Sequence, residues 1–562
     1  MTPDLILTNA RVLTMDPGQP HAEAVAIAGD RIVAVGTTRE VERLEGAATE
    51  VFDAKGATVL PGFVESHLHL VLGGAELAHL QLGHAEGLEQ LTRAFRDFGV
   101  ANPDLPLLMA QGGHYAMLDQ PMTRADLDRV MPDRPIAITA HDHHTVWANT
   151  AALKAAGILH GAAMPHGHEV VIGADGTATG ELREFEAFAP VIALGGEARL
   201  NLGIATGGEP SPWPSEAEQA IDRAKVAAGL RHCAMHGITS MVNMDGNRYT
   251  LELLRGLQRK GKLTARVKVP FHFKPHMELS DLDRADTLPR DSAGDRLMTR
   301  DFADDWLRSG FVKMFMDGVV DSRTAYMLND YPGAPGHRAH PLFEAERFKS
   351  ICTEIDRRGL QIAVHAIGDG AVRATINGYE AARMANGPRD SRHRIEHIEL
   401  IDRADIPRLG TLGITASLQP PHAPGALAFA LEPSHRTIGF DRLKDAYLWR
   451  TLAESGAPLA FASDWPVTDV SVMRGIGAAL TRRPFDAPGC ADERVGLMQT
   501  LHAYTAGGAW AAHADGLTGT LRAATAADIV VLSGDIAATP DEEAATLKVA
   551  LTVAGGRVTW RA

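Results

Sequence analysis

Eight short apolar runs, each followed by turn or helix signals, constrain the fold of this chain more than any other feature of its sequence. Most of them are nearly continuous in apolar residues, which is typical of parallel strands that helices cover on both faces. Eight such units predict an α/β fold built on a (β/α)8 barrel of the TIM type. The predicted strands are Phe63 to His69, Ile238 to Met244, Ala265 to Phe273, Phe311 to Asp317, Gln361 to Ile367, His393 to Leu400, Ile414 to Gln419 and Pro458 to Asp464.

The two ends of the chain share a second pattern, in which short apolar strands alternate with Gly and Asp turns. Because both ends predict β structure, the economical arrangement is one small β-sandwich built from residues 1–60 and 516–562. The metal-binding barrel then covers residues 61–515. The stretch after the first barrel strand is far longer than a crossover needs, so we predict an inserted subdomain over about residues 74–228, with a strand at 134–140 and a hairpin within 169–182.

Composition excludes several classes of partner. A net charge of −15 argues against a general nucleic-acid binder and against an anionic membrane surface. The three cysteines are far apart and form no CxxC pair, so a reducing compartment is the simpler interpretation. The first residues lack the features of a signal peptide, and no run approaches the roughly 18 to 20 apolar residues of a membrane span. We therefore predict a cytoplasmic protein with a small-molecule partner, and assembly into a homo-oligomer stays open.

The first barrel strand ends in two histidines, His67 and His69, whose side chains point to the same side because strand side chains alternate. Imidazole is the commonest metal ligand, but in a chain with 25 His a lone His-x-His easily arises by chance. The pair gains weight because other buried strands also end in residues that are costly to bury unless paired or metal-bound. Barrel enzymes place their chemistry at these ends. The further candidates are Lys313, His365, His397 and Asp464.

This pattern of residues resembles the amidohydrolase superfamily of metal-dependent hydrolases, and so does the split β-sandwich. Further segments are similar to the branch that includes N-substituted formamide deformylases. The resemblance covers nearly the whole chain. The segments are Asp317-Gly318 with Ser322-Arg323-Thr324-Ala325, His365-Ala366-Ile367-Gly368-Asp369, Ser463-Asp464-Trp465-Pro466-Val467, Tyr504-Thr505 with Gly507-Gly508-Ala509, and Asp142-His143-His144 with Trp147-Ala148-Asn149.

The resemblance implies a binuclear metal centre. A lysine ammonium is a poor ligand, but in this family the equivalent lysine commonly reacts with carbon dioxide, so a carbamate on Lys313 is expected to bridge two cations. His67, His69 and Asp464 would complete one site, and His365 and His397 the other. Nitrogen and oxygen ligands without thiolate suit two zinc ions, with manganese, iron, nickel or cobalt as alternatives. A metal-bridging hydroxide would attack a carbonyl, and Asp464 would shuttle the proton to the leaving amine.

Several roles stay open in the sequence. Lys313 could instead be an ammonium paired with Asp317 or Asp464, which would leave a one-metal site. His143, His144 and Trp147 of the insertion either cover the barrel mouth and contact substrate or are ordinary loop packing. Arg323 either grips a substrate oxygen or pairs with an acid. Other histidines near strand ends are interpreted as packing residues, namely His114, His272 and His422.

The leading functional prediction is a metal-dependent amidohydrolase that cleaves a carbon–nitrogen bond in an N-acyl or N-formyl amine. Because Trp147, Trp465 and Phe315 flank the predicted site, we expect an apolar or aromatic portion in the substrate. A one-metal deaminase is a second hypothesis, although such enzymes usually carry a glutamate where this chain has Gly368. Esters and lactones present a similar carbonyl. A third hypothesis is a barrel without catalysis that serves as a binding or assembly module.

Overall fold

The computed structural model describes residues 2–83, 85–141, 143–165, 167–285, 303–426 and 431–562, so Asp142 of the insertion lies outside the described residues. All eight predicted strand segments contain strands. Together with β18, which lies outside the predicted segments, these form two parallel sheets with the orders β18-β16-β15-β8 and β17-β19-β20-β21-β22-β23. The strands are β8 (Phe63–Leu68), β15 (Ile238–Asn243), β16 (Arg266–Lys268), β17 (Phe271–His272), β18 (Leu307–Arg308), β19 (Phe311–Phe315), β20 (Gln361–Ala366), β21 (Arg394–His397), β22 (Thr415–Leu418) and β23 (Leu459–Phe461).

The third predicted strand divides into two pieces that belong to different sheets. β16 pairs with β18, whereas β17 pairs with β19. Pro270 lies between the pieces and has no N–H to donate, which is a reason for the ladder to break there. Near the other edge, the Asp464 N–H donates to the His67 carbonyl at 2.9 Å. The two sheets are therefore joined through one strand and approach each other at β8 and the residues after β23.

Helices alternate with these strands along the chain, and their sequences explain where they begin and what they bury. α8 (Glu216–Met235) begins at a capping box in which Ser215 and Glu218 satisfy each other's backbone N–H groups. α9 (Arg248–Arg259) places Leu251, Leu254 and Leu257 on its buried side. Among the helices in the described part of the chain, none is both long enough and apolar enough to cross a membrane. The other helices that follow strands of these sheets in the chain are α2 (Leu70–Glu76), α11 (Ala345–Arg357), α12 (Asp369–Asn386), α13 (Ile406–Leu412), α15 (Trp449–Glu454), α16 (Val472–Thr481), α17 (Leu497–Ala503) and α18 (Ala506–Ala511).

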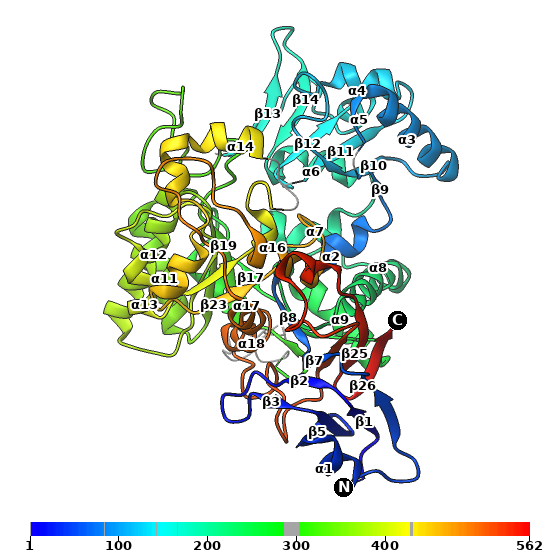
Figure 1. Cartoon of the computed structure of the whole chain (residues 1–562). Helices are drawn as coiled ribbons and strands as arrows, with labels where there is room; N and C mark the ends of the chain where they lie inside the picture. Colours follow the sequence, from blue (N-terminus) through cyan, green and yellow to red (C-terminus); the bar gives the residue numbers. More distant parts are fainter. Residues whose placement is uncertain (1, 84, 142, 166, 286–302, 427–430) are drawn as a thin grey trace.

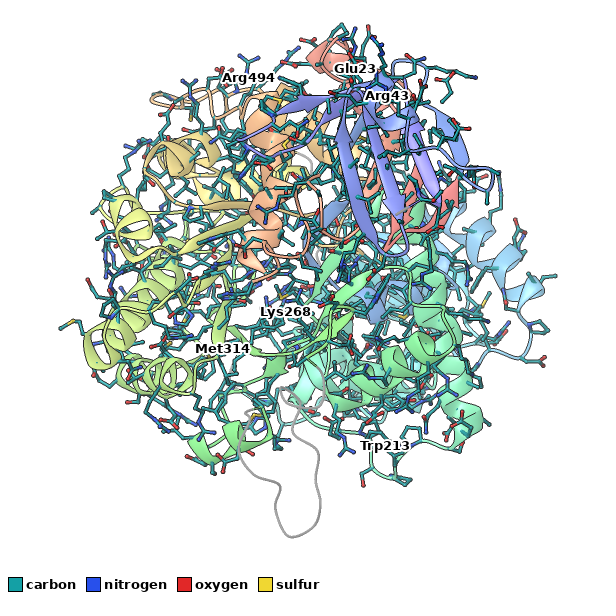
Figure 2. All side chains as sticks on the ribbon, turned by 90° about the horizontal axis from the view of Figure 1, so that it is seen from below. Glu23, Arg43, Trp213, Lys268, Met314 and Arg494 are labelled. Atoms are coloured by element: carbon teal, nitrogen blue, oxygen red, sulfur yellow. The ribbon has the colours of Figure 1, made fainter. Side chains whose placement is uncertain are left out.

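Strands from the two chain ends lie side by side at the base of the molecule (Figure 1). One sheet has the order β26-β25-β24-β7-β2-β3 and a second the order β5-β4-β1-β6. Figure 2, seen from below, shows these strands in front and Lys268 of β16 near the centre. The sequence did not indicate β2, β3 and β6. The bounds are β1 (Leu5–Thr8), β2 (Arg11–Leu13), β3 (His21–Ala22), β4 (Ala24–Ala28), β5 (Arg31–Gly36), β6 (Glu50–Asp53), β7 (Thr58–Pro61), β24 (Ile529–Leu532), β25 (Val549–Ala554) and β26 (Arg557–Arg561).

The insertion after β8 forms its own six-stranded sheet with the order β13-β14-β12-β11-β10-β9 and lies at the top of Figure 1. The predicted strand at 134–140 is confirmed as β11, and the predicted hairpin as the antiparallel pair β13 and β14. Its own buried core includes Val146, Leu153 and Phe188. The elements are β9 (Leu80–Gln81), α3 (Gly87–Ala101), β10 (Leu108–Gly113), α4 (Arg124–Val130), β11 (Ile136–Ala140), β12 (Thr145–Ala148), α5 (Thr150–Ala155), β13 (Glu169–Ile172), β14 (Ala178–Arg183), α6 (Phe185–Ala193) and α7 (Ala198–Thr206).

Candidate metal centre

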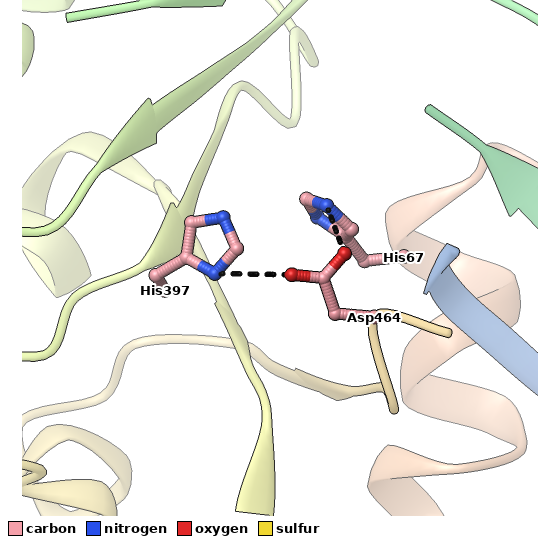
Figure 3. Close-up of side chains that lie close together, drawn as sticks. All are labelled: His67, His397 and Asp464. Atoms are coloured by element: carbon pink, nitrogen blue, oxygen red, sulfur yellow. Dashed lines mark ion pairs between the residues drawn. The ribbon is translucent and has the colours of Figure 1, made fainter. Parts of the chain in front are cut away.

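Three strand ends converge on the carboxylate of Asp464. His67, near the end of β8, places its Nε2 atom 3.2 Å from Asp464 Oδ1, and His69 places its Nε2 atom 3.3 Å from the same oxygen. His397, the last residue of β21, lies on the other side, with Nδ1 3.9 Å from Asp464 Oδ2 (Figure 3). All four side chains are buried. The parallel strands thus bring three imidazoles to one carboxylate, although the residues are far apart in the sequence.

This group has the composition and spacing of a cation site. His67, His397 and Asp464 each offer one ligand atom, and these atoms lie within 4.8 Å of one another. Burial, together with the neighbouring His365, lowers the pKa of His397 well below its usual value, so its imidazole is neutral. Burial alone would raise the pKa of Asp464, but His67, His69 and His397 hold it well below its usual range. A neutral imidazole, as at His397, and an ionised carboxylate, as at Asp464, are donors that a divalent metal requires.

Lys313 of β19 lines a cavity whose wall also includes His67, His69, His397 and Asp464, and we call it the metal cavity. Its side chain is 1% exposed, and its Nζ atom has no hydrogen-bond partner among the described residues. Burial lowers its pKa to about 8. Asp317, one of the two acids considered as its ion-pair partner, instead accepts backbone N–H groups from Tyr326, Ile367 and Gly368. The lysine is therefore a buried amine without a counterion in contact.

His365 of β20 completes the set that the sequence singled out. Its ring centroid lies 4.5 Å from that of His397, and its Nε2–H donates to the Gly318 carbonyl at 3.0 Å. Burial lowers its pKa well below the usual value, so this imidazole is neutral as well. All six predicted ligands line one cavity, as its lining residues show: His67, His69, Lys313, His365, His397 and Asp464.

Three further polar residues orient these side chains, and the sequence reasoning did not identify them. His67 Nδ1 donates to Glu396 at 2.7 Å, His69 Nδ1 to Asp245 at 2.5 Å, and His397 Nδ1 to the side-chain carbonyl of Gln419 at 2.9 Å. Such partners fix which ring nitrogen carries the proton. The sequence does contain a signal for these residues, because all three are polar and lie within or just after predicted strands: Asp245, Glu396 and Gln419.

The electrostatics at His69 differ from those at the other imidazoles. Burial lowers its pKa, but the carboxylates of Asp245 and Asp464 outweigh that effect and raise the pKa to about 9. Metal-free protein therefore holds His69 as an imidazolium at neutral pH. Because a ligand imidazole must be neutral, cation binding here requires loss of that proton and weakens as pH falls.

The insertion supplies residues at the mouth of the site. His143 lines the cavity, with Nε2 3.0 Å from Glu76, and His144 lines it with Nδ1 2.8 Å from Glu184. The remaining predicted insertion contact, Trp147, lines a larger neighbouring cavity rather than the metal cavity.

Arg323, on the segment after β19, also lines the larger cavity. Trp465 lines neither of the two. It packs against Gly73, where an added Cβ would lie 2.6 Å from the indole, and against the ring of His232.

His422, which the sequence reasoning interpreted as a packing residue, lines the metal cavity, with Nε2 3.8 Å from Asp464 Oδ2. It belongs to the short helix η2 (Pro420–His422) directly after β22, so it reaches the same edge as the other histidines. His272 instead hydrogen-bonds the Met244 carbonyl at 2.9 Å. Both histidines lie near strand ends, so that position alone could not predict that His422 lines the metal cavity and His272 does not.

A family model described as "Amidohydrolase family" matches residues 50–560. The chain belongs to the amidohydrolase family. Protein LONG AFTER FAR-RED 3 of Arabidopsis thaliana is 28% identical over 94% of this chain and 87% of that protein. N-substituted formamide deformylase of Arthrobacter pascens is 27% identical over 95% of this chain and 94% of its own length. The resemblance predicted from the strand-end residues is thereby confirmed.

A solved structure supports the fold of this amidohydrolase. The uncharacterized metal-dependent hydrolase from Pyrococcus horikoshii superposes with a TM-score of 0.71 at 22% identity, over 96% of this chain and 99% of that one. At that identity the likeness concerns the fold alone, and it agrees with the predicted mixed α/β architecture.

Proposed function

We propose that this chain is a metal-dependent hydrolase that cleaves an amide-type carbon–nitrogen bond. The observation that carries the proposal is the buried group of His67, His397 and Asp464, whose ligand atoms lie within 4.8 Å of one another beside an unpartnered Lys313 amine. Imidazoles around an ionised carboxylate, next to an amine without a hydrogen-bond partner among the described residues, are costly to bury and have no evident packing role. Family membership makes a hydrolase the natural use of such a site.

The residues present fit two divalent ions. We assign His67, His69 and Asp464 to one ion and His365 and His397 to the other, with Lys313 between them as a carbamate. The donor set contains nitrogen and oxygen but no thiolate, which suits zinc, with manganese, iron, nickel or cobalt as alternatives. We also propose that the two parallel sheets form one (β/α)8 barrel around this site, flanked by a composite domain of residues 1–60 and 516–562.

The surroundings of Lys313 support its proposed carboxylation. The reaction joins a neutral amine to carbon dioxide, forms one N–C bond and releases one proton. Burial lowers the pKa of Lys313 to about 8, so a substantial fraction of the amine is neutral near physiological pH. The product is a carbamate anion, and its two oxygen atoms are ligands that the amine itself does not provide.

The chain's own residues then move the proton. Bound divalent ions would lower the pKa of a water molecule and polarise a carbonyl group. Asp464, ionised and in contact with two imidazoles, would accept the proton from the attacking water and pass it to the leaving nitrogen. Phe185, Phe315 and His144 line the same metal cavity.

An assay with metal-free protein tests this function. Protein reconstituted with zinc and bicarbonate is expected to release formate from N-formylbenzylamine or acetate from N-acetylbenzylamine, whereas the metal-free protein is not. The formyl compound is the first choice because a relative matched over most of both chains is an N-substituted formamide deformylase. Hydrolysis of esters or lactones without any amide turnover would contradict the proposed bond, and so would ammonia release from an aminopyrimidine.

A further inference from the structure

A second cavity of about 1040 Å³ adjoins the metal cavity. It is lined by residues of the insertion and of the parallel sheets, and we call it the chamber. The chamber and the metal cavity share four lining residues, namely His144, Phe185, Phe315 and Asp321. A ligand in the chamber therefore lies next to the candidate metal site, and its volume suits a small organic molecule.

Aromatic rings form much of the chamber wall. Tyr115 and Trp147 of the insertion lie edge to face, with ring centroids 5.2 Å apart. Phe185 of α6 adds a third ring, and Phe273 and Phe315 come from the parallel-sheet region. Rings in several orientations provide both faces and edges for contact, which favours a flat aromatic group over an aliphatic chain.

Most charges in the chamber are already balanced. Arg183 pairs with Glu169 and Glu181 at 2.8 and 2.7 Å. Lys274 donates to the Ile204 carbonyl, and the nearby Glu186 raises its pKa against the larger lowering effect of burial. Of the other lining acids, Glu184, Asp317 and Asp321 accept hydrogen bonds from side chains or backbone, whereas Glu186 acts electrostatically on Lys274.

Among the arginine and lysine side chains that line the chamber, Arg323 is the exception. Its side chain is exposed at the chamber wall, and its guanidinium has no hydrogen bond or ion pair with any described residue. Its backbone, by contrast, is fixed: the N–H donates to the Val320 carbonyl at 2.9 Å, and its carbonyl accepts from His337 Nε2 at 3.1 Å. Its φ of 58° lies in the left-handed region, which is unfavourable for a residue with a Cβ atom. Retained strain of this kind clusters at ligand-binding sites.

We propose that the chamber binds an aromatic group that carries a carboxylate, with Arg323 as the partner of that carboxylate. The substrate would then be an amide whose portion remote from the scissile bond is aromatic and anionic. This inference rests on the proposed function, because the chamber is useful to catalysis only if the adjoining site hydrolyses the amide. A guanidinium is suited to the role because it offers several donors to a planar carboxylate.

Binding measured by calorimetry tests the inference without turnover. The metal-loaded enzyme is expected to bind 3-phenylpropionate at least about 10-fold more tightly than 3-phenylpropan-1-ol. Arg323→Ala should abolish that preference, Arg323→Lys should retain part of it, and Arg338→Ala should leave it unchanged, because Arg338 is an exposed arginine outside the chamber lining. A preference that survives Arg323→Ala would place the carboxylate elsewhere, and absence of any preference would also overturn the inference.

Kinetics separate this inference from the proposed function. N-formyl-4-(aminomethyl)benzoate should exceed N-formylbenzylamine in kcat/KM by about 10-fold, and Arg323→Ala should remove the difference mainly through KM. Equal kcat/KM values for the two amides would contradict the anionic subsite and leave the hydrolase proposal intact. If neither amide is hydrolysed while the calorimetric preference persists, the hydrolase proposal fails and the carboxylate site stands.

Discussion

At the scale of single residues, the Asp464 carboxylate organises the site. It contacts His67 and His69 through one oxygen and faces His397 with the other. The surrounding imidazoles keep its pKa well below the usual range despite its burial. An ionised, buried carboxylate next to a cation site can both bind the metal and accept a proton, and these two roles can be separated by substitution.

Replacing Asp464 by Asn should lower kcat by about 10²–10⁴-fold, because an amide cannot accept the proton of the attacking water. The protein should remain folded, as judged by an unchanged circular dichroism spectrum. Metal content, measured in the same samples, shows how much of the loss reflects weaker metal binding. Activity within about threefold of the wild type would contradict the assigned role of Asp464.

The buried amine of Lys313 predicts a pH dependence of reconstitution. Its pKa of about 8 lies below the usual lysine value of 10.5, so the neutral, reactive fraction grows as pH rises through about 8. The rate at which zinc and carbon dioxide restore activity, at a fixed carbon dioxide pressure, should therefore rise between pH 7 and 8.5 and then level off. A rate that keeps rising tenfold per pH unit beyond pH 9 would indicate an unshifted amine.

At the scale of secondary-structure elements, Asp245 links three of them. It follows β15, accepts from His69 at the end of β8 and also accepts the backbone N–H groups of Val71 and Leu72 at the start of α2. One carboxylate therefore orients a predicted ligand and begins the helix that follows it. The orientation of His69 therefore depends on a residue that follows the neighbouring strand β15 as well as on β8.

Asp245→Asn should weaken zinc affinity by about 10–100-fold, because His69 loses the charged partner that orients it. Competition with a chromogenic chelator measures the affinity. The matched control is Asp356→Asn, which changes another buried acid that contacts a histidine, His393 at 3.1 Å, but that does not line the metal cavity. Equal losses of affinity in both variants would show that general destabilisation, rather than orientation, is responsible.

The elements were predictable from the sequence where the signal was local. The eight apolar runs indicated the strands, and reading the residues at their ends brought together His67, His69, Lys313, His365, His397 and Asp464. The partnership of Asp245 with His69 depends on the lateral register of β15 on β8, which no local pattern encodes. The same applies to the packing of Trp465 against Gly73, which removes that indole from the cavity lining.

At the scale of the whole molecule, a buried ion pair connects the sheets of the chain ends to the parallel sheets. Arg266 of β16 contacts Asp528, just before β24, at 2.7 Å, and both side chains are almost fully buried. Asp528 also accepts the Gly555 N–H at 2.8 Å. Pairing of both chain ends was predictable from their shared strand texture, whereas this contact, between residues 262 positions apart in the chain, was not.

Asp528→Ala should destabilise the protein by about 3–5 kcal/mol, because it leaves the Arg266 guanidinium buried without its counterion. Urea unfolding followed by circular dichroism measures the loss. Glu454→Ala, which removes one partner of an exposed ion pair with Arg450, is the control and should leave the midpoint unchanged. Similar midpoints for both variants would mean that the buried pair does not couple the two regions.

The metal content of the protein tests the central claim most directly. Protein purified without chelator and supplied with zinc and bicarbonate should contain about two zinc ions per chain by elemental analysis, and Lys313→Met should contain clearly fewer. Wild-type protein that retains one zinc ion or none under these conditions would contradict the two-ion site. Equal zinc content in wild type and Lys313→Met would contradict the bridging role of Lys313.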